Sequence, residues 1–400
     1  MKIAVVGVGT AGLMSLCHFL AHSPKGTTVT AVYDPAIDIL GIGESSTWGL
    51  PKMLFQGTGF NLAEYADWLD ATPKFGVSWK NWRDNDFESV IQPGGYGIHF
   101  NNFKMKEFCF MRFEKMWQDT FKVIEGTVSD IVNNQSHASV IINNNEETFD
   151  LVVDCRGYPT DYTDYNLIED MPVNHCLVHT ITKPGDWNTT IHQATKNGWM
   201  FGIPLKTRQG WGYLYNDKIT SKQEATNDIA DIFDTPVNDL KLKEFSFKPY
   251  YAKTFFDGRI LKNGNTSLFF EPLEALSGFF YESSLRTVFD FLEGQYSIDE
   301  VNTQLTTLAQ DLELFYHYVY HGGSTFDSPF WDKIKTASTA KLASNPRWQE
   351  TINLVNECIT EDEIKEIPIG FWFTEKWIAW EEKFNYSYFK QNAGNFYFKK

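Results

Sequence analysis

Residues 2–12 read Lys2-Ile3-Ala4-Val5-Val6-Gly7-Val8-Gly9-Thr10-Ala11-Gly12, an apolar run that leads into three closely spaced glycines. Apolar side chains from Leu13 to Leu20 follow at helical spacing, and a second apolar run, Val29 to Tyr33, ends in Asp34. A strand, a glycine turn, a helix and a second strand that ends in an acid are typical of a dinucleotide-binding unit.

Each residue of this turn has a predicted task. Gly7 permits the tight turn, Gly9 lets the backbone approach a pyrophosphate, and Gly12 lets the helix pack closely on the strand. Thr10 and Ala11 open the helix, whose N-terminus faces the phosphates. Asp34 is predicted to accept hydrogen bonds from the ribose hydroxyls.

The composition excludes several other classes of protein. The 400 residues are 42% hydrophobic and 22% charged, with a formal net charge of -16. Such a charge repels phosphates and anionic lipids, so neither nucleic acid nor a membrane is the expected partner. No apolar stretch could span a bilayer, and the N-terminus lacks a signal-peptide cleavage site. Five scattered cysteines without a CxxC pair predict reduced thiols and a cytoplasmic location.

Beyond the first unit, the pattern predicts strands and then helices. Strands are expected over residues 127–132, 139–142, 149–153 and 205–215, and helical periodicity begins at Leu285. We therefore expect an α/β fold with a Rossmann-type core, a strand-rich substrate subdomain and a helical C-terminal region. The predicted division is a core of interleaved subdomains over residues 1–290 and a mainly helical region over residues 291–400.

Six further segments occur in the order of known family motifs. They are Gly41-Ile42-Gly43-Glu44-Ser45-Ser46-Thr47, residues 72–82, Trp199-Met200-Phe201-Gly202-Ile203-Pro204, Phe270-Glu271-Pro272-Leu273-Glu274-Ala275-Leu276-Ser277, His317-Tyr318 and Asp327-Ser328-Pro329-Phe330-Trp331. Together with the glycine turn, they resemble the motifs of flavin-dependent halogenases of the tryptophan-halogenase type.

The resemblance implies a flavin-monooxygenase-like fold and a defined chemistry. In that family, reduced FAD (FADH2), oxygen and a halide ion, whether chloride, bromide or iodide, generate hypohalous acid for ring halogenation. The resemblance maps the catalytic lysine to Lys74, which would hold the oxidant, and the catalytic glutamate to Glu274, which would steady the cationic ring intermediate or remove its proton. It places the halide at the backbone amides of Leu276 and Ser277.

The resemblance also assigns residues around the flavin and the substrate. The flavin strap would be Gly43, Glu44, Ser45, Ser46 and Thr47, with Trp199, Ile203 and Pro204 near the flavin and His99 and Phe100 near the substrate. Plainer interpretations exist for each type of residue. Lys74 could be a surface lysine, Glu274 an acid that stabilises a helix N-terminus, Trp199 a core side chain and His99 a loop histidine.

Two departures from the family pattern affect the prediction. Gly264-Asn265-Thr266-Ser267-Leu268-Phe269 replaces the usual GDA-type flavin motif, which predicts weaker FAD binding or a different contact to the ribityl chain. The C-terminal region is shorter than in enzymes that act on free tryptophan, and Trp372, Trp377 and Trp380 could line a pocket or pack. The compact length and acidic balance resemble viral halogenases of marine cyanophages, which would place the chain in a host cytoplasm.

Three functions therefore stay open at this level. The first is a halogenase that acts on an electron-rich aromatic or indole small molecule, with a separate NAD(P)H flavin reductase as its electron source. The second is an aromatic flavin monooxygenase, and the third is a catalytically inactive flavin-binding protein. We expect no metal site, because the pairs His175/His179 and His317/His321 lack the glutamate of HExxH. A homo-oligomer is compatible with the sequence, which does not set the number of subunits.

Overall fold

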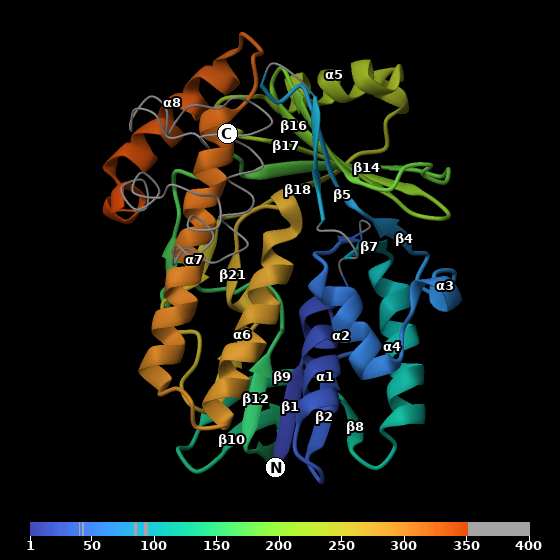
Figure 1. Cartoon of the computed structure of the whole chain (residues 1–400), viewed down its shortest axis with the longest axis vertical. Coiled ribbons are helices and arrows are strands. Elements are labelled where there is room, and N and C mark those ends of the chain that lie inside the picture. Colours follow the sequence, from blue (N-terminus) through green and yellow to red (C-terminus); the bar gives the residue numbers. More distant parts are fainter. Residues whose placement is uncertain (40, 42–43, 84–85, 92–94, 351–400) are drawn as a thin grey trace, which may run out of the picture.

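The computed structural model describes residues 1–39, 41, 44–83, 86–91 and 95–350 of the chain. In Figure 1 the N-terminal parallel sheet lies at the bottom and a larger sheet lies at the top, with α7 running along both. The described helices are α1 (Thr10–His22), α2 (Gly49–Thr58), α3 (Leu62–Tyr65), α4 (Asn102–Met116), α5 (Lys222–Phe233), α6 (Leu276–Leu292), α7 (Ile298–Gly322) and α8 (Pro329–Ser344).

The lower part is built on a five-stranded parallel sheet of order β20-β12-β1-β2-β8. Its strands are β1 (Lys2–Val6), β2 (Thr28–Tyr33), β8 (Phe121–Glu125), β12 (Leu151–Asp154) and β20 (Ile260–Lys262). Alternate side chains of β1 enter different cores, because Ile3 and Val5 pack with the helices while Ala4 and Val6 pack with a second small sheet. Burial on both faces explains why this strand is an uninterrupted apolar run.

The second small sheet is an antiparallel meander of β9 (Val128–Asn133), β10 (Ala138–Ile142) and β11 (Asn145–Phe149). The expected strand over 149–153 is in fact two strands, β11 and β12, which belong to different sheets. The chain changes sheet at Asp150, whose carboxylate accepts a hydrogen bond from the Lys2 backbone N–H at 2.7 Å. A local apolar pattern cannot reveal such a change of partner.

The upper part is a seven-stranded sheet of order β18-β14-β17-β16-β15-β5-β6. Its strands are β5 (Gly76–Lys80), β6 (Phe87–Val90), β14 (His175–Ile181), β15 (Thr190–Thr195), β16 (Gly198–Pro204), β17 (Gln209–Tyr215) and β18 (Lys243–Ser246). Met200 packs toward α5, whereas Trp199, Phe201 and Ile203 face the opposite core, which contains α7. The expected strand over 205–215 begins only at Gln209, because Leu205 and Arg208 close a tight turn.

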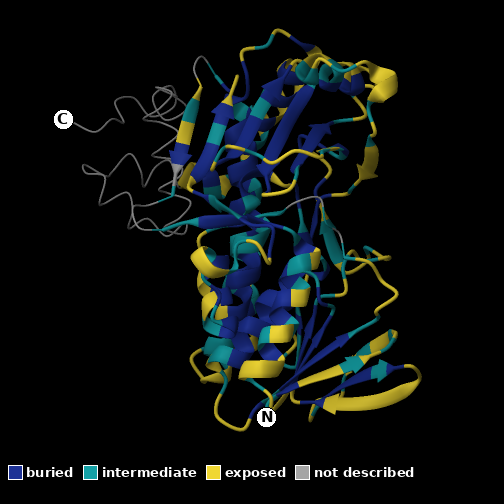
Figure 2. Ribbon diagram, turned by 90° about the vertical axis from the view of Figure 1, so that its right-hand side faces the viewer, coloured by how far each residue is buried: buried dark blue, intermediate teal, exposed yellow. Residues whose placement is uncertain are grey.

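Two three-stranded sheets join these parts. One contains β3 (Glu44–Ser45), β7 (Gly97–Phe100) and β4 (Thr72–Lys74), and the other contains β13 (Tyr165–Leu167), β19 (Tyr250–Ala252) and β21 (Leu268–Phe269). Short 3-10 helices cover Val237–Asp239, Gly264–Thr266 and Leu273–Ala275. In Figure 2 the strands of the two large sheets are mostly buried, whereas β9 and β11 carry many exposed residues.

Helices dominate residues 276–350, the described part of the C-terminal region, but they begin earlier than the periodicity indicated. α6 starts at Leu276, so the predicted boundary at residues 290 and 291 falls within this helix. Ser297 and Glu300 form a capping box at the start of α7, and Ser328 caps α8 ahead of Pro329. Trp372, Trp377 and Trp380 lie outside the described residues.

Candidate active site

A cavity of about 510 Å³ lies at the carboxyl ends of the parallel strands, beside the glycine turn. In open α/β sheets this edge is where ligands bind. Among the predicted cofactor residues, those that line the cavity are Gly7, Gly9, Thr10, Ala11, Gly12, Asp34 and Glu44. The structure thus brings the whole turn, the acid after β2 and the start of the predicted strap to one place.

The three glycines of the turn differ in what a side chain at each position would contact. Gly7 has φ of +98°, and a Cβ there would lie 2.3 Å from the Cys155 carbonyl oxygen. A Cβ at Gly12 would lie 2.0 Å from the Gly7 carbonyl oxygen. A Cβ at Gly9 would meet no atom of the described residues within 4 Å. Gly7 and Gly12 are therefore required by the fold itself, whereas Gly9 leaves space open to the cavity.

The cavity also offers the polar groups that FAD needs. Among the described residues, no side chain caps the N-terminus of α1, so its first N–H groups can reach phosphate oxygens. The Asp34 carboxylate accepts hydrogen bonds from the Thr127 hydroxyl at 2.5 Å and from the Ala36 N–H at 2.9 Å. These bonds, the one from Thr127 first, lower the pKa of Asp34 and keep it an acceptor for ribose hydroxyls. The residues present fit the cofactor.

The sequence analysis did not predict two of the residues that line this cavity. Arg156 and Tyr158, in the loop after β12, line the same cavity because β12 is the parallel neighbour of β1. The Arg156 guanidinium is oriented by two hydrogen bonds of 2.9 Å to the Asp154 carboxylate. A second strand that ends in an acid followed by a glycine, Asp154 to Gly157, was the available signal.

The segment that replaces the GDA-type motif also reaches the cavity. Gly264 and Asn265 line it, and the side-chain oxygen of Asn265 accepts a hydrogen bond from the Tyr281 hydroxyl at 3.0 Å. Gly264 has φ of +65°, and a Cβ there would lie 2.7 Å from the Ala11 Cβ. The shortened segment therefore packs directly on the glycine turn and lines the cavity in which the cofactor is predicted to bind.

A second cavity, of about 260 Å³, adjoins the first and shares Thr10, Glu44 and Tyr281 with it. The predicted site residues that line it are Ser45, Ser46, Thr47, Lys74, Phe100, Ile203, Glu274 and Ser277. Residues that lie 200 positions apart in the chain, Lys74 and Glu274, thus face one space. Gly43 lies outside the described residues.

Lys74 ends the short strand β4 and is almost fully buried, with 3% of its surface exposed. It pairs in register with Gly97 of β7, where a Cβ would lie 2.7 Å from the Ser46 carbonyl oxygen. This close packing joins the strand that carries Lys74 to the predicted strap. The interpretation of Lys74 as a surface lysine is therefore wrong, because its side chain lies inside the protein, where a lysine is rare.

Glu274 lies in a strained turn immediately before α6. Glu274 and Ala275 both have left-handed backbones, with φ of 59° and 58°. A residue other than glycine in this conformation lowers the stability of the fold by about 1 kcal/mol or more, and such strained residues are concentrated at functional sites. The Ser89 hydroxyl donates to Glu274 Oε1 at 3.2 Å, and Trp79 Nε1 donates to that hydroxyl at 3.3 Å.

The same turn leaves the start of α6 open. In the part of the chain that the structure describes, no side chain caps α6, whose first two residues are Leu276 and Ser277. Their backbone N–H groups belong to a helix N-terminus, where an anion is stabilised. Ser277 lines the second cavity, while the Leu276 side chain is buried in the core.

Besides Leu276, three of the predicted residues that the structure describes line neither cavity. The indole of Trp199 is buried in the core, and its Nε1 donates a hydrogen bond to the Tyr320 hydroxyl at 2.6 Å. Pro204 ends β16, and its carbonyl accepts from the Thr72 hydroxyl at 2.7 Å. His99 is fully buried between the hydroxyls of Thr72 and Thr190, at 3.2 Å and 2.9 Å. Burial, with the charge of Lys74, holds the pKa of His99 well below its usual value.

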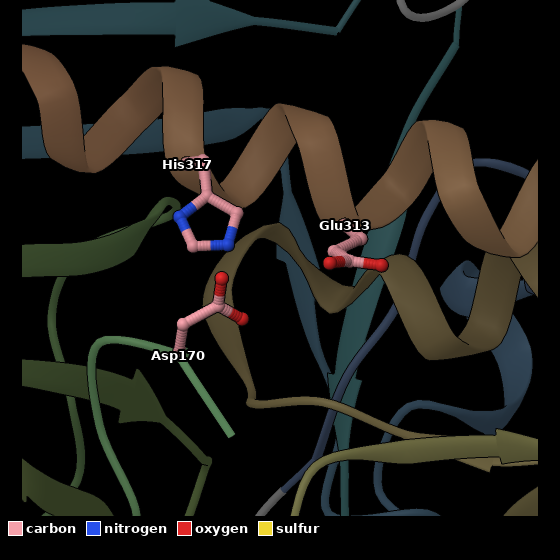
Figure 3. A group of neighbouring side chains, drawn as sticks. All are labelled: Asp170, Glu313 and His317. Atoms are coloured by element: carbon pink, nitrogen blue, oxygen red, sulfur yellow. The ribbon is translucent and has the colours of Figure 1, made fainter. Parts of the chain in front are cut away.

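One group of potential metal ligands occurs among the described residues, and it involves His317. Asp170, Glu313 and His317 place ligand atoms within 4.8 Å of one another, with the two latter side chains projecting from α7 (Figure 3). Lys341 Nζ lies 3.0 Å from Asp170 Oδ2 and 2.7 Å from Glu313 Oε1. Burial lowers the pKa of His317 to about 4. Lys341 thus forms an ion pair with each of the two carboxylates, beside a histidine that burial keeps neutral.

Comparison with solved structures defines the class of the fold. The structure aligns with the tryptophan halogenase from Shewanella frigidimarina NCIMB 400 with a TM-score of 0.77 at 18% identity, over 96% of this chain and 89% of that one. It aligns with Xcc4156, a flavin-dependent halogenase from Xanthomonas campestris, with a TM-score of 0.75 at 16% identity, over 93% and 88% of the two chains. The fold is that of the flavin-dependent halogenases.

The sequence comparisons give the family. A family model described as tryptophan halogenase matches residues 2–138 and 85–384. The chain is 23% identical to the tryptophan 7-halogenase KtzQ of Kutzneria sp. (strain 744) over 417 aligned residues, 84% of this chain and 78% of that protein. The chain belongs to the tryptophan halogenase family, so it is an enzyme that uses reduced FAD and a halide.

Within the described residues, no helix has both the length and the hydropathy that crossing a bilayer requires.

Proposed function

We propose that this enzyme halogenates an electron-rich aromatic small molecule, an indole or a phenol, with Lys74 and Glu274 as its catalytic residues. The observation that carries the proposal is that both side chains line one cavity, directly adjoining the cavity of the glycine turn. FAD supplies the oxidising chemistry when it is bound. The chain must then deliver a diffusible oxidant to a ring without releasing it to water.

Lys74 suits the delivery of that oxidant. Its amine is buried, so an oxidant held there by a hydrogen bond or as a haloamine is shielded from solvent. Glu274 suits the charge that develops on the ring. Its carboxylate is oriented through the Trp79–Ser89 hydrogen bonds before any substrate arrives, which is the preorganisation that electrostatic catalysis needs.

A separate flavin reductase would supply the reduced FAD. The cysteines among the described residues, Cys17, Cys109, Cys155 and Cys176, are all free thiols, which supports the proposed cytoplasmic location.

The experiment incubates the enzyme with FAD, NADH, a flavin reductase, oxygen and one halide at a time, against a panel of indoles and phenols. A halide-dependent, mass-shifted aromatic product is expected. A hydroxylated product that needs no halide would instead identify an aromatic flavin monooxygenase. No product with any halide or substrate would leave an inactive flavin-binding protein.

Lys74→Ala tests the assigned lysine within the same assay. Halogenation should be lost while NADH-driven flavin turnover and FAD affinity stay near the wild-type values, since Lys74 acts after the flavin has reacted. Lys80→Ala is the matched control, because Lys80 ends the neighbouring strand β5 and is exposed. Regioselective halogenation by Lys74→Ala at the wild-type rate would remove Lys74 from the mechanism.

A further inference from the structure

Glu271 is a second buried acid in the turn that carries Glu274. It is 1% exposed, and its Oε2 accepts a hydrogen bond from the Tyr320 hydroxyl at 2.8 Å. That hydroxyl in turn accepts the 2.6 Å bond from Trp199 Nε1. The carboxyl groups of Glu271 and Glu274 are thus each held by a tryptophan that acts through a hydroxyl.

The other oxygen of Glu271 is buried and has no hydrogen-bond partner among the described residues. Glu271 lines the second cavity, together with Glu274 and Ser277. A buried polar atom without a partner is costly, so its retention needs a reason. Because Oε2 is committed to Tyr320, Oε1 is the atom left for a molecule in the cavity.

The protonation of Glu271 decides what Oε1 can bind. Burial raises the pKa of Glu271 to about 8, against the opposing effect of the Tyr320 hydrogen bond. Tyr320 has one hydroxyl hydrogen, and it is directed at Oε2. The proton of the neutral acid therefore lies on Oε1, which makes this atom a hydrogen-bond donor.

A donor at this position suits an anion. The uncapped N-terminus of α6, with the amides of Leu276 and Ser277, belongs to the same turn and also favours an anion. A second carboxylate in a cavity that already contains Glu274 would repel a halide, whereas a neutral carboxyl group would donate to it.

We propose that Glu271 is a ligand of the halide ion, to which its Oε1–H donates a hydrogen bond alongside the backbone N–H groups of Leu276 and Ser277. This assignment rests on the halogenase function proposed above and adds a side chain to the predicted halide site. It also gives Trp199 a task away from the cofactor, since the indole orients Tyr320, which orients the acid.

Other titratable groups surround this carboxyl group. Those that line the cavity are Glu44 of β3, Lys74 of β4, His192 of β15, Glu274 before α6 and Tyr281 of α6, and Tyr316 and Tyr320 of α7 lie against Glu271. Burial raises the pKa of all three tyrosines, so they stay neutral as Glu271 ionises. Loss of the Glu271 proton at alkaline pH therefore adds a negative charge that no ionising tyrosine accompanies.

The test measures chloride binding to the full-length protein by chloride NMR line broadening, with gluconate as the ionic-strength control. The chloride affinity of the wild type should fall about tenfold as the pH rises through about 8, because one charge-assisted hydrogen bond is lost. Glu271→Gln keeps a neutral donor of similar size, so its chloride affinity should stay constant over the same range. Glu271→Met removes the donor and should bind chloride about tenfold more weakly at every pH.

Each result decides between the alternatives. Wild-type affinity in Glu271→Met, or a fall in the affinity of Glu271→Gln with pH as large as that of the wild type, would overturn the assignment. Halogenation by the wild type would then leave the proposed function intact. No chloride binding by the wild type together with no halogenated product would overturn both. If Glu271→Met does not fold, the pH profile of Glu271→Gln decides alone.

Discussion

Gly9 and Gly12 offer a sharp test of the dinucleotide site, because the same change should act on different properties at the two positions. Gly9 has φ of -71° and ψ of -172°, a backbone that alanine adopts without strain, and within the described part of the chain its added Cβ would touch no atom within 4 Å. Gly12→Ala would instead drive a methyl group to 2.0 Å from the Gly7 carbonyl oxygen.

These contacts set the expected magnitudes. Gly9→Ala reduces the entropy of the unfolded chain, worth about 0.4–1 kcal/mol, but it also replaces glycine by a poorer N-cap residue, at a similar cost. The free energy of unfolding should therefore change by less than about 1 kcal/mol. Gly12→Ala forces a backbone shift and should lower it by about 3 kcal/mol, at the upper end of overpacking effects. FAD affinity should fall at least about tenfold in Gly9→Ala, since the methyl group occupies the space left for the pyrophosphate.

Urea unfolding of the two variants without FAD, followed by FAD titration of the folded Gly9→Ala protein through flavin fluorescence, provides both quantities. Gly9→Val should weaken FAD further without a matching loss of stability. Wild-type FAD affinity in Gly9→Ala would show that the open space beside Gly9 is not the phosphate site. Equal destabilisation by Gly9→Ala and Gly12→Ala would refute the argument from contacts.

Two further predictions concern charge. Glu274→Gln keeps the shape of the side chain but removes its charge, so flavin turnover should continue while the rate of aromatic product formation falls about 10²–10³-fold. Hypohalous acid should then reach a trapping dye in solution. Halogenation at the wild-type rate would make Glu274 a structural acid. Burial lowers the pKa of His18 to about 3 in the folded protein, against 6.5 in the unfolded chain. Between these two values only the unfolded state binds the proton, so the free energy of unfolding decreases as the pH falls. Urea unfolding at pH 7 and pH 5 should show this loss, at up to about 1.4 kcal/mol per pH unit, and His18→Phe should reduce it; an equal pH dependence in both proteins would assign it to other groups.

The local sequence predicted those parts of the site that depend only on residues close together in the chain. The glycine turn needs only the strand before it and the helix after it, and Asp34 follows from the strand that comes next. Arg156 and Tyr158 were missed because their position depends on β12 being the neighbour of β1, a pairing between residues about 150 positions apart.

The resemblance to family motifs identified site residues that the local sequence pattern could not, but it did not distinguish the roles of individual residues within one motif. It brought Lys74 and Glu274 forward as partners, and the structure places both in one cavity. It also placed Trp199 near the flavin, whereas the indole contacts Tyr320, a residue more than a hundred positions later in the chain. Glu271 drew no attention in the sequence, because burial and an unpartnered oxygen are properties of the folded chain alone.

The order β20-β12-β1-β2-β8 has a consequence for synthesis of the protein on the ribosome. The first strand to emerge, β1, is an inner strand whose neighbour β12 ends at Asp154, and the edge strand β20 ends only at Lys262. Until those residues have left the ribosome, the nascent chain presents an apolar strand with an unpaired edge, the feature that drives wrong pairing and aggregation. A fragment that stops near residue 200 would contain the complete glycine turn and still lack β20. All seven strands of the upper sheet precede β20 in the chain, so the parallel sheet beside the nucleotide site is completed only after the upper sheet has been made.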